Sequence, residues 1–277
     1  MLAALIIVFR EVFEAGLIIG IVLAVTRTVP HRNRWIGGGV LVGVLAACVV
    51  AAFAGALSNL FAGMGQELFN AAILTVAVVM LTWHNVWMAR HGSELAGELR
   101  SAGQAVVEGA KSLLALAVVV GVAVLREGSE VVLFLYGVLA AGGDSAWSVA
   151  LGGFGGLLLG ALICVLTYVG LIRIPMRALF ATTTVLIALL AAGMAAQATH
   201  FLEQANWLTA MDTIVWDSGW LLSDSSFLGR ALHTLIGYTD QPTAMQLVVY
   251  LAILLVTFVL MRIYGSPAKA MPEPAHG

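Results

Sequence analysis

The chain carries the pattern Arg-Glu-x-x-Glu twice, each time in the middle of an apolar run. At about 100° per residue, the three charged side chains of one copy project from one face of a helix. Four carboxylates against two guanidiniums leave a surplus of negative charge that a cation would neutralise, and carboxylate oxygens suit hard metal ions. We predict a cation site with metal-binding glutamates and two arginines that organise them. The residues are Glu11, Glu14, Glu127 and Glu130, with Arg10 and Arg126.

Six charges at such depth need a physical reason. Each ionisable side chain at the centre of a membrane helix costs about 2.5–3.5 kcal/mol, so six cost on the order of 15–20 kcal/mol before pairing. The alternative to a cation site is a structural network in which each arginine pairs with glutamates simply to survive burial. Because both copies keep one more carboxylate than guanidinium, the cation site is favoured.

The composition excludes a soluble domain. Hydrophobic residues make up 61% of the chain and charged residues 10%, with a mean hydropathy of +1.01, whereas soluble domains are nearer one half apolar. We predict an all-α polytopic membrane protein with seven transmembrane helices. Their ranges are 2–26, 36–58, 67–89, 112–140, 147–171, 178–200 and 244–263. The first range is no signal peptide, because it lacks a basic start and holds three charges. Cys48 and Cys164 fall inside predicted helices, where we expect packed thiols.

Basic residues predict the orientation, because Lys and Arg in short loops stay on the cytoplasmic side. Outside the two motifs, ten Lys or Arg residues flank the helices on one side and only Arg230 on the other. The N-terminus is therefore expected outside and the C-terminus in the cytoplasm. The segment 201–243 is expected on the outer face.

The two motifs belong to an internal repeat. A shift of 116 residues, which carries Arg10 onto Arg126, also carries Cys48 onto Cys164 and His84 onto His200. Each repeat holds three helices, an odd number, so the second copy must be inverted in the membrane. Inverted repeats place substrate near the midplane, between the halves. We expect helices 2–26 and 112–140 to cross antiparallel, motif against motif.

This organisation predicts a single transmembrane domain over residues 1–264. Its parts are repeat one at about 1–90, repeat two at about 112–203, the outer segment 201–243, helix 7 at about 244–263, and a disordered cytoplasmic tail at 265–277. A mixed-charge, solvated connector is expected between helices 3 and 4. Glycines spaced four apart, such as Gly39 and Gly43 or Gly156 and Gly160, would allow close helix packing.

Further polar residues suggest an ion path. His84 is expected near the cytoplasmic end of helix 3 and His200 near the outer end of helix 6, at opposite mouths of a possible path. Imidazole can bind metal ions and transfer protons there. The alternative is an interfacial hydrogen-bonding role. Four acids at the outer side could collect metal at the entrance: Glu203, Asp212, Asp217 and Asp224. The alternative is a solvated loop with an aromatic belt. Part of the segment is expected to form amphipathic helix at the interface.

At these motifs the chain resembles the oxidase-dependent iron permeases, which comprise the fungal high-affinity iron permease and bacterial EfeU-type permeases. The resemblance covers nearly the whole chain and implies seven transmembrane helices with iron-handling glutamates at Glu11, Glu14, Glu127 and Glu130. The first motif departs from the common Arg-Glu-Gly-x-Glu form at Val12, whereas the second keeps Gly128. This departure affects helix packing more than ligands. Trp216-Asp217-Ser218 also looks like a stretch in bacterial members.

The resemblance implies an iron permease of the bacterial cytoplasmic (inner) membrane that moves ferrous or ferric iron into the cell, without a permanently bound cofactor. Implied partners are iron ions, the lipid bilayer, and a ferroxidase or periplasmic cupredoxin-like and haem peroxidase-like proteins. No nucleic acid is expected, and the oligomeric state is open. Two other functions fit the residues: a proton-coupled carrier or exporter of another divalent cation, or a membrane metalloenzyme.

Overall fold

The computed structural model describes residues 1–60, 66–142, 145–170, 176–224 and 226–264, and every regular element within them is an α-helix. This confirms the predicted all-α class. The predicted tail, residues 265–277, lies outside the described residues. The helices are α1 (Leu2–Val25), α2 (Arg32–Leu60), α3 (Gln66–Val107), α4 (Leu113–Ala140), α5 (Ala146–Val169), α6 (Met176–Gln204), α7 (Phe227–Ile236) and α8 (Ala244–Tyr264).

Five helical segments are long and apolar enough to cross a membrane, which makes the chain a multi-pass membrane protein. They are Arg32–Ala56, Gln66–Met88, Ala146–Val169, Ala181–Gln204 and Ala244–Tyr264. With 24 and 28 residues, α1 and α4 are also long enough. Each of them differs from the five by carrying three charged residues near its middle.

Helix α3 departs from the prediction. It runs for 42 residues, which at 1.5 Å per residue is about 63 Å, roughly twice the thickness of the hydrocarbon core. The expected connector after residue 89 is therefore mostly helix. Its charged residues suggested a loop, but Leu99 and Val106 lie buried in a cluster with residues of α1, α2 and α4. This apolar stripe holds the second half of α3 against the bundle.

The outer segment also contains helical structure. The amphipathic helix α7 begins at Ser226, whose hydroxyl accepts a hydrogen bond from the Gly229 amide at 2.9 Å. It ends at Gly237, which adopts a φ of +70° that favours glycine. The predicted amphipathic helix in this segment is confirmed as a helix of ten residues.

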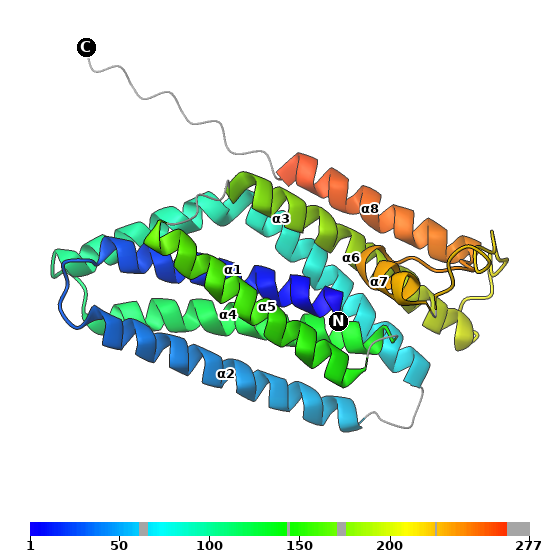
Figure 1. Cartoon of the computed structure of the whole chain (residues 1–277), viewed down its shortest axis with the longest axis horizontal. Helices are drawn as coiled ribbons and strands as arrows, with labels where there is room; N and C mark the ends of the chain where they lie inside the picture. Colours follow the sequence, from blue (N-terminus) through cyan, green and yellow to red (C-terminus); the bar gives the residue numbers. More distant parts are fainter. Residues whose placement is uncertain (61–65, 143–144, 171–175, 225, 265–277) are drawn as a thin grey trace, which may run out of the picture.

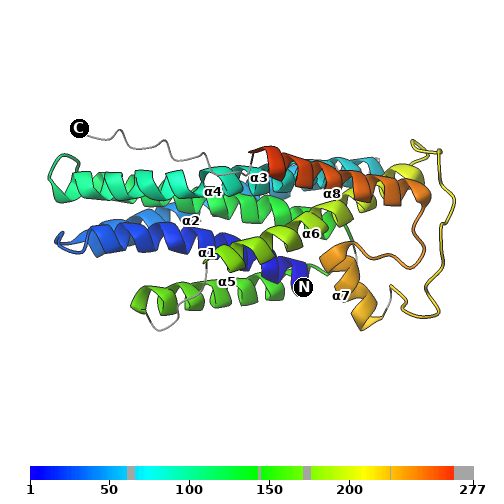
Figure 2. The same cartoon turned by 90° about the horizontal axis from the view of Figure 1, so that it is seen from above.

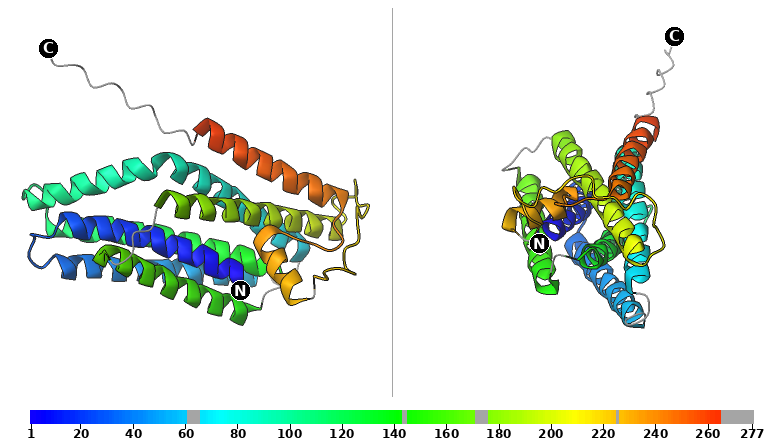
Figure 3. Two further views of the ribbon diagram at one scale, coloured as in Figure 1. Left: turned by 45° about the horizontal axis from the view of Figure 1, so that its top comes forward. Right: turned by 90° about the vertical axis from the view of Figure 1, so that its right-hand side faces the viewer.

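The helices form an elongated bundle in which α1 and α4 run in opposite directions (Figure 1). The N-terminus, α7 and the loop before α8 lie at one end, and the α1–α2 and α3–α4 connections lie at the other (Figure 2). Helix α1 packs against α5, α4 packs against α2, and α3 packs against α6 (Figure 3). The first helix of each half is therefore held by the second helix of the other half.

Glycines bring these pairs close together. A Cβ added to Gly39 of α2 would lie 2.5 Å from the Ala117 carbonyl oxygen of α4, and one on Gly160 of α5 would lie 2.9 Å from Val12 Cγ1 of α1. Backbones can approach this closely only where a side chain is missing. Gly160 thus provides the space for Val12, the residue that departs from the common motif.

Two apolar clusters flank the charged motifs along the bundle. One contains Ile7 of α1 and Phe134 of α4, and the other contains Ile18 of α1 and Val120 of α4. The charged residues of both motifs fall between these positions in the sequence. They therefore form a polar layer with apolar packing before and after it.

Gly39 and Gly38 provide a matched test of the α2–α4 contact. Gly39→Ala should destabilise the protein by about 1–3 kcal/mol through overpacking, because its new Cβ would also lie 3.0 Å from Ala117 Cα. Gly38→Ala adds a methyl group where nothing lies within 4 Å, so its thermal midpoint in detergent should stay near the parent value. Equal midpoints for the two variants would contradict the packing.

Candidate metal centre

The charged motifs meet where α1, α3 and α4 contact one another. On α1, Arg10, Glu11 and Glu14 are only 2%, 1% and 2% exposed. On α4, Glu127 is 3% exposed and Glu130 is nearly as well covered. Carboxylates removed from water this completely require compensating charge or hydrogen bonds.

Each arginine pairs with the glutamate four residues later. Arg10 Nε lies 2.8 Å from Glu14 Oε1, and Arg126 Nε donates a hydrogen bond to Glu130 Oε1 at 3.2 Å. The glutamate next to each arginine is farther away. Arg10 Nη1 lies 3.9 Å from Glu11 Oε1, and Arg126 Nε lies 4.0 Å from Glu127 Oε1. The helical spacing thus leaves Glu11 and Glu127 as the less compensated carboxylates.

His84 of α3 joins the two motifs. Its Nε2 lies 3.5 Å from Glu14 Oε2, its Nδ1 contacts Glu130 Oε2, and the side chain is 3% exposed. The predicted position of His84 at a mouth of the path stays a prediction, but its side chain lies between the two motifs. Because α3 continues to Val107, His84 lies in the interior of the helix and points into the bundle.

Four side chains offer ligand atoms that all lie within 4.8 Å of one another: Glu11, His84, Glu127 and Glu130. Two unit charges at that separation repel by about 3.5 kcal/mol at an effective dielectric constant of 20. Neither oxygen of Glu11 accepts a hydrogen bond from an N–H or hydroxyl donor in the described part of the chain, although both are buried. This donor set has the composition of a site for a divalent cation.

The two arginines differ in accessibility. Arg10 is 2% exposed, whereas Arg126 is 36% exposed. The Arg126 guanidinium lies 4.1 Å from the ring centre of Trp87, and that ring stacks on His91 at 5.1 Å. The polar layer is therefore sealed beside Arg10 and more open beside Arg126, along the part of α3 that follows His84.

An apolar groove of about 750 Å³ lies over the α1–α4 crossing, between α2 and α5. Glu11 and Glu127 are the acidic residues among those that line it, and Cys48 and Cys164 belong to its walls. Walls of this kind offer few polar partners to a hydrated cation.

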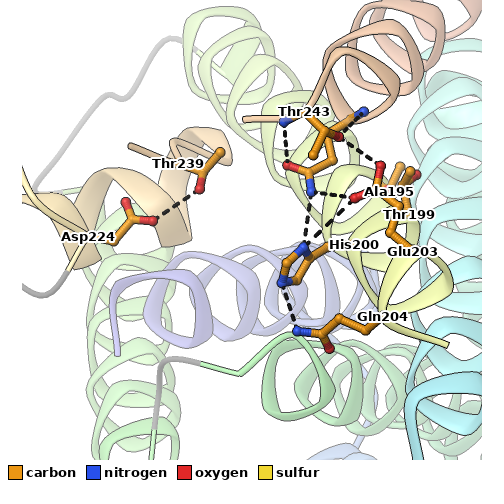
Figure 4. A network of polar contacts seen from close by, with 9 residues as sticks. Ala195, Thr199, His200, Glu203, Gln204, Asp224, Thr239 and Thr243 are labelled. Carbon is orange, nitrogen blue, oxygen red and sulfur yellow. Dashed lines mark hydrogen bonds and ion pairs between the residues drawn. The ribbon is translucent and has the colours of Figure 1, made fainter. Parts of the chain in front are cut away.

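His200 makes polar contacts that link two helices and do not involve the buried glutamates. The ring nitrogens of His200 contact the side-chain amides of Gln246 and Gln204 at 3.1 and 3.0 Å. Gln246 also donates to Glu203 Oε2 at 3.1 Å, and Thr243 Oγ1 donates to Glu203 Oε1 at 2.8 Å (Figure 4). Thr243 and Gln246 form a reciprocal capping box at the start of α8. His200 and Glu203 thereby tie α6 to α8.

The predicted outer acids do not join the buried glutamates. Asp217 accepts hydrogen bonds from the Gly219 amide at 2.9 Å and from Gln241 at 3.0 Å. Asp224 accepts one from Thr239 at 3.1 Å (Figure 4). Asp212 is exposed. The hydrogen bonds of Asp217 and Asp224 organise the outer segment.

Trp87 and Gln246 were not identified in the sequence. Trp87 contacts Arg126 of the polar layer, and Gln246 links α6 to α8. A Thr-x-x-Gln pattern before an apolar run signals a capping box, so the role of Gln246 at the start of α8 was detectable. Nothing in the sequence signalled that Trp87 would face Arg126.

Comparison with known proteins gives a consistent result. Residues 1–266 match the model of the iron permease FTR1 family. The ferrous iron permease EfeU of Escherichia coli O6:H1 (strain CFT073) is 33% identical over 277 residues, covering 97% of this chain and 99% of the relative. The ferrous iron permease EfeU of Yersinia pestis is 30% identical over 264 residues, covering 94% and 93%. No solved structure matches the chain. The matches place the chain among transporters rather than enzymes, and the protein belongs to the iron permease FTR1 family.

Proposed function

We propose that the protein is an iron permease that moves ferrous iron across the bacterial cytoplasmic membrane into the cell. The cargo follows from the family and from the names of its relatives. The observation that carries a metal-translocating role is the group of buried ligand atoms within 4.8 Å at the meeting of α1, α3 and α4. The binding unit is a composite site to which both motifs contribute, so neither motif works alone.

In this proposal, iron exchanges water for the oxygens of Glu11, Glu127 and Glu130, whose mutual repulsion a dication relieves. Glu14 completes the four-glutamate set from the Arg10 side, where its contacts with Arg10 and His84 hold the layer together. Arg10 and Arg126 keep the carboxylates of Glu14 and Glu130 in place through charge-assisted contacts from Nε while no cation is bound. A dication then brings the formal charge of four glutamates and two arginines to zero.

We propose that the helices span the membrane as seven segments, with α1–α3 and α4–α6 as inverted repeats and α8 as helix 7. The opposite directions of α1 and α4 and the exchanged pairs α1–α5 and α4–α2 support this architecture. Alternating access follows if the repeats exchange conformations around the fixed site. The buried Arg10 and the exposed Arg126 then correspond to a conformation in which the glutamate site is closed toward the N-terminal end of the bundle.

The proposed topology puts the N-terminus outside and the end of α8 in the cytoplasm. The acids Asp212, Asp217 and Asp224 belong to the segment at the N-terminal end of the bundle, and we assign them an entrance role. Periplasmic cupredoxin-like or haem peroxidase-like proteins, or a ferroxidase, would deliver iron there. A proton-coupled carrier of another divalent cation would use the same carboxylates, and the uptake assay below distinguishes it by competing metals.

Loss of a single composite-site glutamate should stop transport. Glu11→Gln and Glu127→Gln, one in each motif, should each lower the initial rate of iron(II) uptake into proteoliposomes at least about tenfold, since even outer-shell partners of metals cost 10–100-fold. Glu98→Gln, at an exposed position of α3, is the matched control and should keep the parent rate. Full activity of both motif variants would contradict the proposal, and faster uptake of manganese than iron would favour the alternative carrier.

Thermal stability separates this function from a purely structural ion-pair network. Glu11→Gln removes a buried charge whose oxygens lack hydrogen-bond partners, so the metal-free variant should melt at or above the parent temperature. Breaking a buried structural pair would instead cost about 3–5 kcal/mol. A large loss of stability in the metal-free variant would therefore identify Glu11 as a structural partner.

Site-directed labelling tests the orientation. In a background without Cys48 and Cys164, Thr209→Cys should react with a membrane-impermeant maleimide on intact spheroplasts, and Glu108→Cys should react only after lysis. Both positions are exposed and lie beyond opposite ends of the bundle, after α6 and after α3. The reverse pattern would overturn the proposed topology.

A further inference from the structure

We infer that His84 is a nitrogen ligand of the transported cation and that it gives the site its preference for transition metals over magnesium and calcium. This inference rests on the proposed function and extends it from a carboxylate site to a mixed site of three carboxylates and one imidazole. His84 lies on α3, outside both motifs, and enters the polar layer from the side.

The imidazole of His84 lies close enough to the glutamates of both motifs to share a metal ion with them. One ring nitrogen faces Glu14 of the first motif and the other contacts Glu130 of the second. A ligand atom of the ring lies within 4.8 Å of those of Glu11, Glu127 and Glu130. Both ring nitrogens are buried and face carboxylate oxygens. The ring is therefore held between the two motifs, among the acids that carry the other ligand atoms.

The repeat makes the position of His84 more informative. The glutamates occur in symmetry-related pairs, but the histidines do not act as a pair. His200, the repeat mate of His84, contacts Gln246 and Gln204 and lies 4.0 Å from Glu203. Of these two histidines, only His84 of the first repeat supplies an imidazole to the polar layer. The set of metal-binding atoms is therefore asymmetric, although the two helices that carry the glutamates are related by the repeat.

An imidazole changes the metals that such a site selects. Carboxylates alone suit magnesium, calcium and manganese, whereas imidazole suits iron, zinc, copper and nickel. Three carboxylates with one imidazole favour a divalent transition metal, and they disfavour the hard ions that cells contain at higher concentration. The selectivity that the two motifs cannot provide would thus come from α3.

Iron K-edge absorption on the purified protein loaded anaerobically with iron(II) tests the ligand assignment. The parent protein should show the multiple-scattering signature of one imidazole. His84→Gln, which substitutes an amide oxygen, should lose that signature and bind iron(II) about 10–100-fold more weakly. Its magnesium affinity, measured by competition, should stay within about threefold because oxygen ligands suit that ion. The matched control His200→Gln should keep both the signature and the parent affinities.

The outcomes distinguish this inference from the proposed function. Iron bound by the parent protein without an imidazole signature would overturn the role of His84 and leave the four-glutamate site standing. Absence of iron binding by the parent protein would overturn the proposed function itself. If His84→Gln does not fold, His84→Asn is the second variant, and an imidazole signature that persists in it would overturn the assignment.

Discussion

The structure depends on one electrostatic constraint: carboxylates from two helices converge in a layer that is mostly buried. Glu11 and Glu127 each lie beside an arginine that is more closely engaged with the next glutamate of its motif. Apolar clusters on both sides of the layer keep the effective dielectric constant low. The resulting repulsion must be relieved by a cation or by protons taken up by the carboxylates. In the proposed function a cation relieves it, which would couple function and fold at the crossing of α1 and α4.

The crossing is stabilised by helices from the opposite half of the chain. Because α1 packs against α5 and α4 packs against α2, each half contributes a helix to the packing of the other. Glycines such as Gly39 and Gly160 allow this exchange at close range. Helix α3 then adds His84 from a third direction. The arrangement brings residues more than a hundred positions apart into one layer, which local sequence contacts could not do.

Most of the helices and the two motifs were predictable from the sequence, because apolar length and charge placement are strong signals. The meeting of the motif residues followed from their spacing and from the internal repeat. The position of His84 was not predictable in this way. Its prediction assumed that α3 ends near residue 89, and the charged residues that follow concealed the buried stripe of Leu99 and Val106. The contact of Trp87 with Arg126 depends on how α3 and α4 pack, which periodicity does not specify.

A crystal structure of iron-soaked protein, with anomalous scattering at the iron edge, would show whether the buried carboxylates bind the cargo. We expect one anomalous peak between α1, α3 and α4, within coordination distance of Glu11, Glu127 and Glu130. Iron found only at the outer segment of a protein that takes up iron, with none between the motifs, would contradict a binding site at the crossing of α1 and α4.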